Sequence, residues 1–147
     1  MIDLAHFKQQ YMEIMPVDVK WGEMDAFQHV NNTVYIRYFE DGRINMLEHL
    51  GMGKDVKASK KGPILASITC DYLTPITYPD TIYVGTNIKQ TGAKKITLEQ
   101  VLFSKKQGKI AAKASSLCVY YDYQALTSCE VTEPISQAIA QRIQSLA

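Results

Sequence analysis

The amino-acid sequence predicts an α+β fold, in which one antiparallel sheet wraps around a long central helix and a second helix ends the chain. Three observations support this prediction. A segment before residue 51 has a broad apolar face at near-helical spacing, four strand-like runs follow with short turn signals between them, and residues 132–147 form an amphipathic stripe. Strands grouped between two helices are typical of α+β proteins.

The first elements follow from periodicity and from the residues at their ends. Apolar side chains alternate over residues 13–21 and predict a first strand, with Pro16 near its start, where a missing N–H does least harm. Residues 33–50 predict the long helix, whose apolar face is wide enough to be buried on more than one side. Asn31 or Asn32 can cap its start, and two glycines directly after it can end it.

Four further strands and a last helix complete the prediction. Residues 64–72 and 82–88 each place their apolar side chains on one parity, which suits a sheet with one buried face. Residues 95–103 change their apolar face midway, which indicates either a β-bulge or a strand covered on both faces. Residues 110–121 carry small side chains on one face, so that a helix can approach closely. Isoleucines at every fourth position predict the final helix over residues 134–146.

Length and composition indicate one globular domain, spanning residues 1–147. Hydrophobic residues make up 46% and charged residues 21% of the chain, and the formal net charge of +1 gives no global attraction for nucleic acid or an anionic membrane. No apolar run approaches the roughly 20 residues of a membrane span, and no signal-peptide hydrophobic region is found at the N-terminus. We therefore expect a soluble cytoplasmic protein.

The cysteines and two of the three histidines give no sign of a functional site. Cys70, Cys118 and Cys129 lie in no spacing typical of a metal site, so we expect no metal. The first two lie in apolar strand-like runs and are expected to pack as small hydrophobic residues. His6 and His49 have no chemically related neighbours and are expected at the surface.

Polar side chains gather in one short segment directly before the predicted long helix. This segment reads WGEMDAFQHVNN and spans residues 21–32. With its flanks, VKWGEMDAFQHVNNTVYIRYFEDGR, it resembles the signature of the hotdog-fold acyl-CoA thioesterases related to 4-hydroxybenzoyl-CoA thioesterase. The segments ASITCDYLTPITYPDTIYV and GKIAAKASSLCVYYD resemble later strands of that family, so the resemblance covers most of the chain from residue 17 to residue 122.

Two positions depart from the common pattern of this family. Gln28 stands where many members have Gly, although the fatty acyl-CoA branch also has Gln there, and Pro79 replaces the usual Gly before the Asp of the following strand. Neither departure changes Asp25. They leave the acyl group open rather than the reaction.

The resemblance implies that an acyl-CoA thioester is hydrolysed to a free carboxylic acid and coenzyme A, without a metal or an organic cofactor. A short motif is sufficient for this chemistry. The leaving thiol has a pKa of about 8.5, against about 15.7 for water, so its expulsion needs little help from an acid. What remains is attack on the carbonyl and stabilisation of the oxyanion, for which one carboxylate and one or two N–H groups suffice.

Asp25 is the expected catalytic carboxylate, either as a general base on water or as a nucleophile that forms an anhydride. On its own, an Asp before a helix is typical of a cap or turn residue, and the resemblance assigns it the catalytic role. The resemblance also assigns the oxyanion to the backbone N–H of Asn32. A helix N-terminus suits this task, because it exposes unpaired N–H groups and carries a partial positive charge.

Three other residues are candidates for binding the substrate. We expect His29 to hydrogen-bond the loop or line the pantetheine channel; a role as general base and a buried, satisfied histidine are the alternatives. Asn31 is expected to organise the loop or cap the helix. Lys94, at a predicted hairpin turn, is a candidate for the phosphates of coenzyme A, with a solvated surface lysine as the simpler interpretation.

Glu40 is an alternative catalytic carboxylate, because some hotdog thioesterases place theirs on the long helix. Arg43 follows it by one turn, and this spacing favours a structural ion pair between the two side chains. The ion pair is the interpretation that we prefer.

The resemblance further implies a homodimer with the active site between two subunits, and dimers that can pair into a homotetramer. Two other functions stay open. A thioesterase for acyl-carrier-protein substrates would favour a basic docking face, for which the small net charge gives little support. A non-catalytic acyl-CoA-binding protein would bind ligand without turnover, and the presence of Asp25 argues against it.

Overall fold

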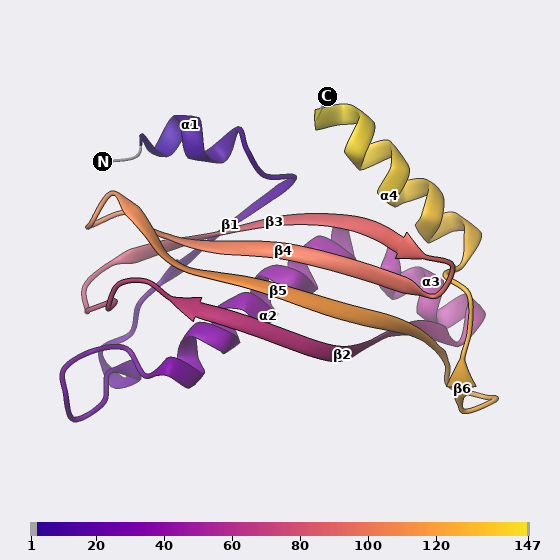
Figure 1. The fold of residues 1–147 in the computed structure, drawn as a ribbon, viewed down its shortest axis with the longest axis horizontal. Helices are drawn as coiled ribbons and strands as arrows, with labels where there is room; N and C mark the ends of the chain where they lie inside the picture. The colour runs from indigo at the N-terminus through magenta and orange to yellow at the C-terminus, as the bar shows by residue number, and fades with distance from the viewer. Residues whose placement is uncertain (1–2, 147) are drawn as a thin grey trace.

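The computed structural model describes residues 3–146, and it confirms the α+β architecture (Figure 1). The elements in chain order are α1 (Leu4–Lys8), β1 (Glu13–Asp18), the 3-10 helix η1 (Trp21–Glu23), α2 (Asn32–His49), α3 (Met52–Ser59), β2 (Lys61–Tyr72), β3 (Thr81–Gly92), β4 (Lys95–Ser104), β5 (Lys109–Asp122), β6 (Thr127–Ser128) and α4 (Glu133–Leu146). Helices α1 and α3 were not expected from the sequence. The predicted first strand ends three residues early, because the chain turns into η1.

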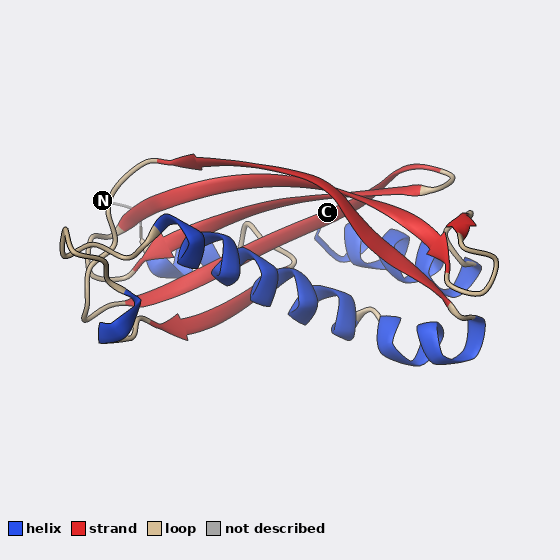
Figure 2. Ribbon diagram, turned by 90° about the horizontal axis from the view of Figure 1, so that it is seen from below, coloured by secondary structure: helices blue, strands red, loops and turns tan. Residues whose placement is uncertain are grey.

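One antiparallel sheet forms the body of the molecule. Its strand order is β1-β3-β4-β5-β2, with the short β6 paired to β5. Helix α2 runs along one face of this curved sheet (Figure 2), and its buried side chains fill the space between them. This is the hotdog arrangement that the resemblance implies. Strand β2 lies at one edge of the sheet, and β1 lies at the other.

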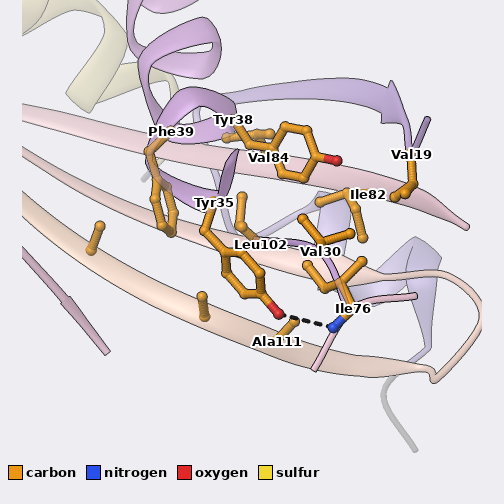
Figure 3. Packing of buried hydrophobic residues seen from close by; sticks show 12 residues of the cluster. Val19, Val30, Tyr35, Tyr38, Phe39, Ile76, Ile82, Val84, Leu102 and Ala111 are labelled. Atoms are coloured by element: carbon orange, nitrogen blue, oxygen red, sulfur yellow. Dashed lines mark hydrogen bonds between the residues drawn. The ribbon is translucent and has the colours of Figure 1, made fainter. Parts of the chain in front are cut away.

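Small residues on both elements allow α2 to approach the sheet closely. Ala112 and Ala114 of β5 lie in the same buried cluster as Phe39 of α2, as expected from the small side chains of this strand. Figure 3 shows the Phe39 ring pointing from the helix towards the sheet. On the helix, Gly42 makes the closest approach: a Cβ added there would lie 2.4 Å from Cγ1 of Val84. The sequence pattern gave no indication that this glycine is needed.

Strand β4 is covered on both faces, which decides between the two interpretations of its pattern. It pairs without a register shift from Leu98 to Val101 with both neighbouring strands, so no bulge lies there. Leu98 belongs to the cluster that contains Met46 of α2. Val101 faces the other way and lies in a cluster with Phe7 of α1. Helix α1 therefore buries the face of β4 that α2 leaves free.

Strand β2 differs from its prediction, because it contains a β-bulge. The pairing with β5 shifts register between Leu65 and Ser67. Ile64 and Ile68 therefore face opposite sides of the sheet, although they share one parity in the sequence. Both Ile64 and Leu65 are 41% exposed, so the edge strand presents apolar side chains to solvent on both faces.

Helix α4 is attached to the rest of the molecule by apolar and charged contacts. Ile135 and Ile139 are buried in a cluster with residues of α2 and of the sheet, whereas Ile143, which the predicted stripe includes, is exposed. Near the end of the helix, Nη1 of Arg142 lies 2.9 Å from Oε1 of Glu13 in β1. The same oxygen lies 2.9 Å from Nδ1 of His49, at the end of α2. One carboxylate thus links three elements.

The remaining expectations concern cysteines, histidines and membrane spans. Cys118 is buried, Cys70 is half-buried, and burial raises the pKa of both thiols. His6 and His49 are exposed, as expected. Within residues 3–146, no helix is both long enough and apolar enough to cross a membrane.

Candidate active site

The segment before α2 forms a closed loop whose ends are held together by backbone hydrogen bonds. Met24 and Val30 form an isolated antiparallel bridge. Inside it, the N–H of Asp25 donates to the carbonyl of His29 at 2.9 Å, and the N–H of Gln28 donates to the carbonyl of Asp25 at 3.0 Å. The sequence therefore folds these polar residues into a tight turn directly before the helix.

Two contacts fix this loop to the rest of the fold. The N–H of Val30 donates to the carbonyl of Ile76 at 2.8 Å, and Val30 is buried. The hydroxyl of Tyr38 donates to Oε1 of Glu23 in η1 at 2.8 Å. Burial and the neighbouring Glu23 carboxylate raise the pKa of Tyr38, so this hydroxyl stays a donor. The loop is thereby anchored from both sides.

Gln28 gives the turn its shape by adopting a left-handed backbone conformation, with φ of +65°. This conformation is unfavourable for residues with a Cβ and is readily adopted by glycine. The turn geometry therefore explains why a glycine is common at this position in the family that the segment resembles. The glutamine here retains the geometry at a cost in backbone energy.

Asp25 uses one carboxylate oxygen to stabilise the turn. Its Oδ1 accepts a hydrogen bond from the N–H of Phe27 at 2.9 Å, as an aspartate in a turn commonly does. In the described part of the chain, no hydrogen bond to Oδ2 is found, and the side chain is half-buried. The carboxylate is thus held in one orientation with an oxygen available to water or substrate. The structural and the chemical interpretation of this aspartate are compatible.

The start of α2 leaves its first N–H available. Asn31 is the N-cap: its Oδ1 accepts hydrogen bonds from the N–H of Thr33 at 2.9 Å and from its hydroxyl at 2.7 Å. Asn32 is the first helical residue, and among residues 3–146 its N–H donates to no acceptor. Helix N-termini attract negative charge through such N–H groups. An oxyanion is a chemically suitable acceptor for the Asn32 N–H.

Two tyrosines that lie outside the polar motif, Tyr35 and Tyr72, lie beside the helix start, and the sequence period does not fix which way they point. The hydroxyl of Tyr72 donates to the carbonyl of Asn32 at 3.3 Å, and the rings of Tyr72 and Tyr35 meet edge to face at 5.1 Å. The hydroxyl of Tyr35 also accepts a hydrogen bond from the N–H of Ile76 at 2.8 Å. Because Ile76 accepts a hydrogen bond from Val30 of the loop, the tyrosines are connected to the loop through this residue. These tyrosines line a shallow hollow of about 280 Å³.

Several apolar side chains are exposed in the loop and next to it. Phe27, next to Asp25 in sequence, is 82% exposed, and Trp21 of η1 is 71% exposed. Tyr72 and Leu73, at the end of β2, are also exposed. Exposed apolar patches of this kind mark contacts with a ligand or with another protein.

The structure does not bring all the candidate binding residues together. His29 lies in the loop beside Asp25, and because its side chain is exposed, the alternative of a buried, satisfied histidine is wrong. Lys94 lies in the turn between β3 and β4, at the opposite end of the sheet from the loop (Figure 1). Within one chain, Lys94 and Asp25 are therefore far apart. Lys106 lies at the Asp25 end, where its Nζ donates to Oγ1 of Thr77 at 2.9 Å.

The ion pair expected between Glu40 and Arg43 is not formed. Arg43 is only 8% exposed and lies against the sheet, whereas Glu40 is exposed to solvent. Among the residues described, Arg43 takes part in no ion pair. The two residues are one helical turn apart, but Arg43 lies at a buried position of α2 and Glu40 at an exposed one, so their side chains lie in different environments. Glu40 also lies on the helix surface and not in the loop that carries Asp25.

Metal ligation has no support in the described residues. Within 3–146, no group of three or more His, Cys, Asp or Glu side chains could hold a metal ion.

Comparison with known proteins places this geometry in a family. The model of the Thioesterase-like superfamily matches residues 19–143, which include the loop, α2 and the whole sheet except β1. The match therefore covers the candidate site and the elements that support it.

Two curated relatives and one solved structure are similar over much of the chain. The long-chain acyl-CoA thioesterase FadM of Escherichia coli (strain K12) is 22% identical over 127 residues, which cover 86% of this chain and 96% of FadM. The chloroplastic acyl-acyl carrier protein thioesterase ATL3 of Arabidopsis thaliana is 30% identical over 101 residues, 68% of this chain and 53% of ATL3, so the match spans about half of that protein. The PA2801 protein, a putative thioesterase from Pseudomonas aeruginosa, has a TM-score of 0.78 at 28% identity and covers 88% of this chain and 99% of its own.

Proposed function

The chain belongs to the Thioesterase-like superfamily, and we propose that it is a thioester hydrolase that converts an acyl-CoA to a free carboxylic acid and coenzyme A. One observation carries this proposal. Asp25, whose half-buried carboxylate has one oxygen unengaged within residues 3–146, sits in a closed loop that leads directly to a helix start, where the N–H of Asn32 is also unengaged by the described residues. The two groups that thioester hydrolysis requires are thus supplied by one short segment.

In the proposed reaction, Asp25 acts on a water molecule or on the thioester itself. As a general base, it takes a proton from water while the water oxygen attacks the carbonyl carbon. The tetrahedral oxyanion then accepts a hydrogen bond from the N–H of Asn32 and collapses, the carbon–sulfur bond breaks, and coenzyme A leaves as a thiolate. As a nucleophile, Asp25 instead forms a mixed anhydride that water hydrolyses in a second step. No metal or organic cofactor takes part in either route.

The other site residues have supporting roles in this proposal. Asn31 holds the helix start by capping it, so that the N–H of Asn32 keeps its direction. His29, exposed beside Asp25, contacts the pantetheine arm of the substrate.

We further propose that the active enzyme is a homodimer, with a homotetramer as the alternative. Strand β2 is an edge strand of 12 residues, and the unpaired N–H and C=O groups of such an edge favour pairing with another chain. A second copy would also cover the exposed apolar residues beside the loop. Lys94 lies far from Asp25 in its own chain, so it can contact the phosphates of the substrate only from the second copy.

The proposal is tested by thiol release from a panel of short, long and aromatic acyl-CoAs. Asp25→Asn keeps the oxygen that accepts from the Phe27 N–H and removes the charge, so the loop should fold normally. We expect this variant to lose at least about 100-fold in kcat. Asp41→Asn, which neutralises an exposed carboxylate on α2, serves as the matched control and should retain activity. Circular dichroism checks the folding of both variants.

Two outcomes would redirect the assignment. Unimpaired turnover by Asp25→Asn would exclude the carboxylate from catalysis. Binding of acyl-CoA without cleavage by the wild type would favour the non-catalytic binding protein. Turnover in ¹⁸O-labelled water separates the two routes, because label incorporated into Asp25 identifies it as the nucleophile.

A thioesterase for acyl-carrier-protein substrates is the second candidate, and the similarity to ATL3 favours it. The two candidates differ in what carries the acyl group. A comparison of kcat/KM for the same acyl chain on coenzyme A and on a carrier protein distinguishes them. We expect the higher value for the acyl-CoA.

A further inference from the structure

Arg43 is a buried cation that the proposed reaction does not use. Its side chain is 8% exposed, and its Nη1 is fully buried without a hydrogen-bond partner in the described residues. No ion pair to Arg43 is found there either. Arginine remains charged in proteins, and an unpaired buried charge is strongly unfavourable. The guanidinium therefore requires an acceptor that one copy of the described chain does not supply.

Cys118 of β5 lies in one buried cluster with Met46 and Leu47 of α2, which follow Arg43 by about one turn. The Arg43 guanidinium lowers the pKa of the Cys118 thiol against the larger opposite effect of burial, which agrees with a position on this side of α2. Cys118 of β5 pairs with Leu65 of β2, next to the bulge in the edge strand. Ser116, which lies two residues before Cys118 on the same face of β5, also has a buried Oγ without a partner. The acceptor for Arg43 must reach this side of the helix.

The neighbouring surface has the properties of an interface. Positions 36, 40, 43, 44 and 47 follow one another at helical spacing and form one flank of α2. On this flank, Ile44 is 51% exposed, and on the edge strand Leu65 is 41% exposed. Residues 62–70 of β2 contain no charged side chain, so the edge lacks the charges that commonly prevent strands from pairing.

The same flank carries one carboxylate, that of Glu40, which is exposed and makes no ion pair in the described chain. In a two-fold interface, any contact between one residue and another occurs twice, with the subunits exchanged. A helix flank that carries an exposed anion and, one helical turn away, a cation only 8% exposed, both without an ion pair in the described chain, is self-complementary under such symmetry. The occupant that fits is a second copy of this chain.

We propose that Arg43 forms an ion pair with the partner subunit's Glu40, and that the pair occurs twice where the α2 flanks and β2 edges of two copies meet. This inference rests on the homodimer proposed above and names the contact that specifies it. The partner carboxylate compensates the charge of the guanidinium, because the arginine fork donates two hydrogen bonds to a carboxylate in a bidentate geometry. The charge of Arg43 is therefore paired only when the dimer forms.

A charge-exchange experiment tests the pair directly. We measure the dimer dissociation constant by sedimentation velocity for the wild type, for Glu40→Arg, for Arg43→Glu, and for an equimolar mixture of the two variants. Each variant alone places like charges against each other, so we expect its dimer to weaken at least about 10-fold. In the mixed dimer, opposite charges face each other at both positions, and dimerisation should recover. A pair within one chain cannot give this recovery. Asp41→Arg, one residue along on the outer side of α2, should dimerise like the wild type.

Arg43 is buried, so a gentler pair of variants protects the test against misfolding. Glu40→Gln and Arg43→Met remove one charge each, and circular dichroism confirms that both are folded. We expect both to weaken the dimer, with a double variant no weaker than Arg43→Met alone. Asp41→Asn is the matched control for Glu40→Gln.

The outcomes separate this inference from the proposed activity. Wild-type affinity in Glu40→Gln, or a mixture that fails to recover, overturns the pair while leaving a dimer in place. A monomeric wild type that still cleaves acyl-CoA overturns the pair and the dimer but leaves the hydrolase. A wild-type dimer that follows the expected charge pattern and cleaves no thioester supports the pair and contradicts the hydrolase.

Discussion

At the scale of single residues, Asp25 combines a structural and a chemical task in one carboxylate. One oxygen accepts the N–H of Phe27 and closes the turn, while the other has no partner in the described residues. A catalytic group must be held in one orientation by contacts that leave its reactive atom free, and this turn does so without further side chains. Asp25→Ala removes the turn contact as well as the charge, so a comparison with Asp25→Asn separates positioning from chemistry.

Gln28 tests whether the turn is strained. A left-handed conformation costs a residue with a Cβ about 1–2 kcal/mol. Substitution by glycine removes this cost, but part of the gain in stability is lost because glycine has a greater conformational entropy in the unfolded chain. Because the side chain of Gln28 is exposed, little packing is lost on truncation. We expect Gln28→Gly to raise the free energy of unfolding by up to about 1 kcal/mol, and Gln28→Val to lower it by about 1–2 kcal/mol. Urea denaturation measures both, and equal destabilisation by the two substitutions would contradict the left-handed turn.

At the scale of elements, the distance between α2 and the sheet depends on Gly42. Alanine favours a helix over glycine by about 1 kcal/mol, but its Cβ would meet Val84 Cγ1 at 2.4 Å and Gln100 Nε2 at 3.1 Å. Overpacking of this kind costs about 1–3 kcal/mol, so we expect Gly42→Ala to lower the free energy of unfolding despite the better propensity. Thermal or urea unfolding gives the value.

Two further variants control this prediction. Gly53→Ala in α3 would place its Cβ 3.3 Å from the end of the flexible Glu48 side chain, so this substitution should be neutral or stabilising. Val84→Ala combined with Gly42→Ala should recover part of the loss, because it removes the contacted methyl groups. A stable Gly42→Ala protein would show that the helix can shift without cost.

Several elements could be predicted because local pattern and tertiary environment agree. The alternation in β3 and the small residues of β5 match the faces observed, since each strand has one face against α2. In β2 the same reasoning failed, because its apolar residues keep one parity across the bulge and so do not mark the change of face there. The site was predictable to a similar degree. The motif located Asp25, whereas Tyr35 and Tyr72 come together only through the fold.

At the scale of the whole molecule, the burial of Arg43 and its pairing with Glu40 could not be predicted from the sequence. Glu40 and Arg43 have the spacing of a helical ion pair, and only the rotation of α2 against the sheet places one in solvent and the other in the core. The burial of Arg43 is therefore a property of the packed molecule. The proposed dimer extends this argument, because the acceptor for a buried cation can come from outside the chain that buries it.

Within one chain, Glu13 links separate elements through its carboxylate, since it joins β1, α2 and α4. Its side chain is 13% exposed and contacts both Arg142 and His49, so Glu13→Gln weakens the ion pair with Arg142 and the contact with His49 at once. Arg142 is partly solvated, which limits the loss to about 1–2 kcal/mol in the free energy of unfolding. Because the contact lies near the end of α4, we also expect Glu13→Gln to speed up amide hydrogen exchange relative to the wild type. This increase should be larger in the last turns of α4 than in the turn around Ile135.

Glu130→Gln is the control for this prediction, because it neutralises an exposed carboxylate just before α4. It should leave both the free energy of unfolding and the exchange rates unchanged. If Glu13→Gln behaves in the same way, then the buried isoleucines alone hold α4 against the sheet. A loss confined to the last turns of α4 would instead show that the apolar and charged contacts of this helix act on separate segments of it.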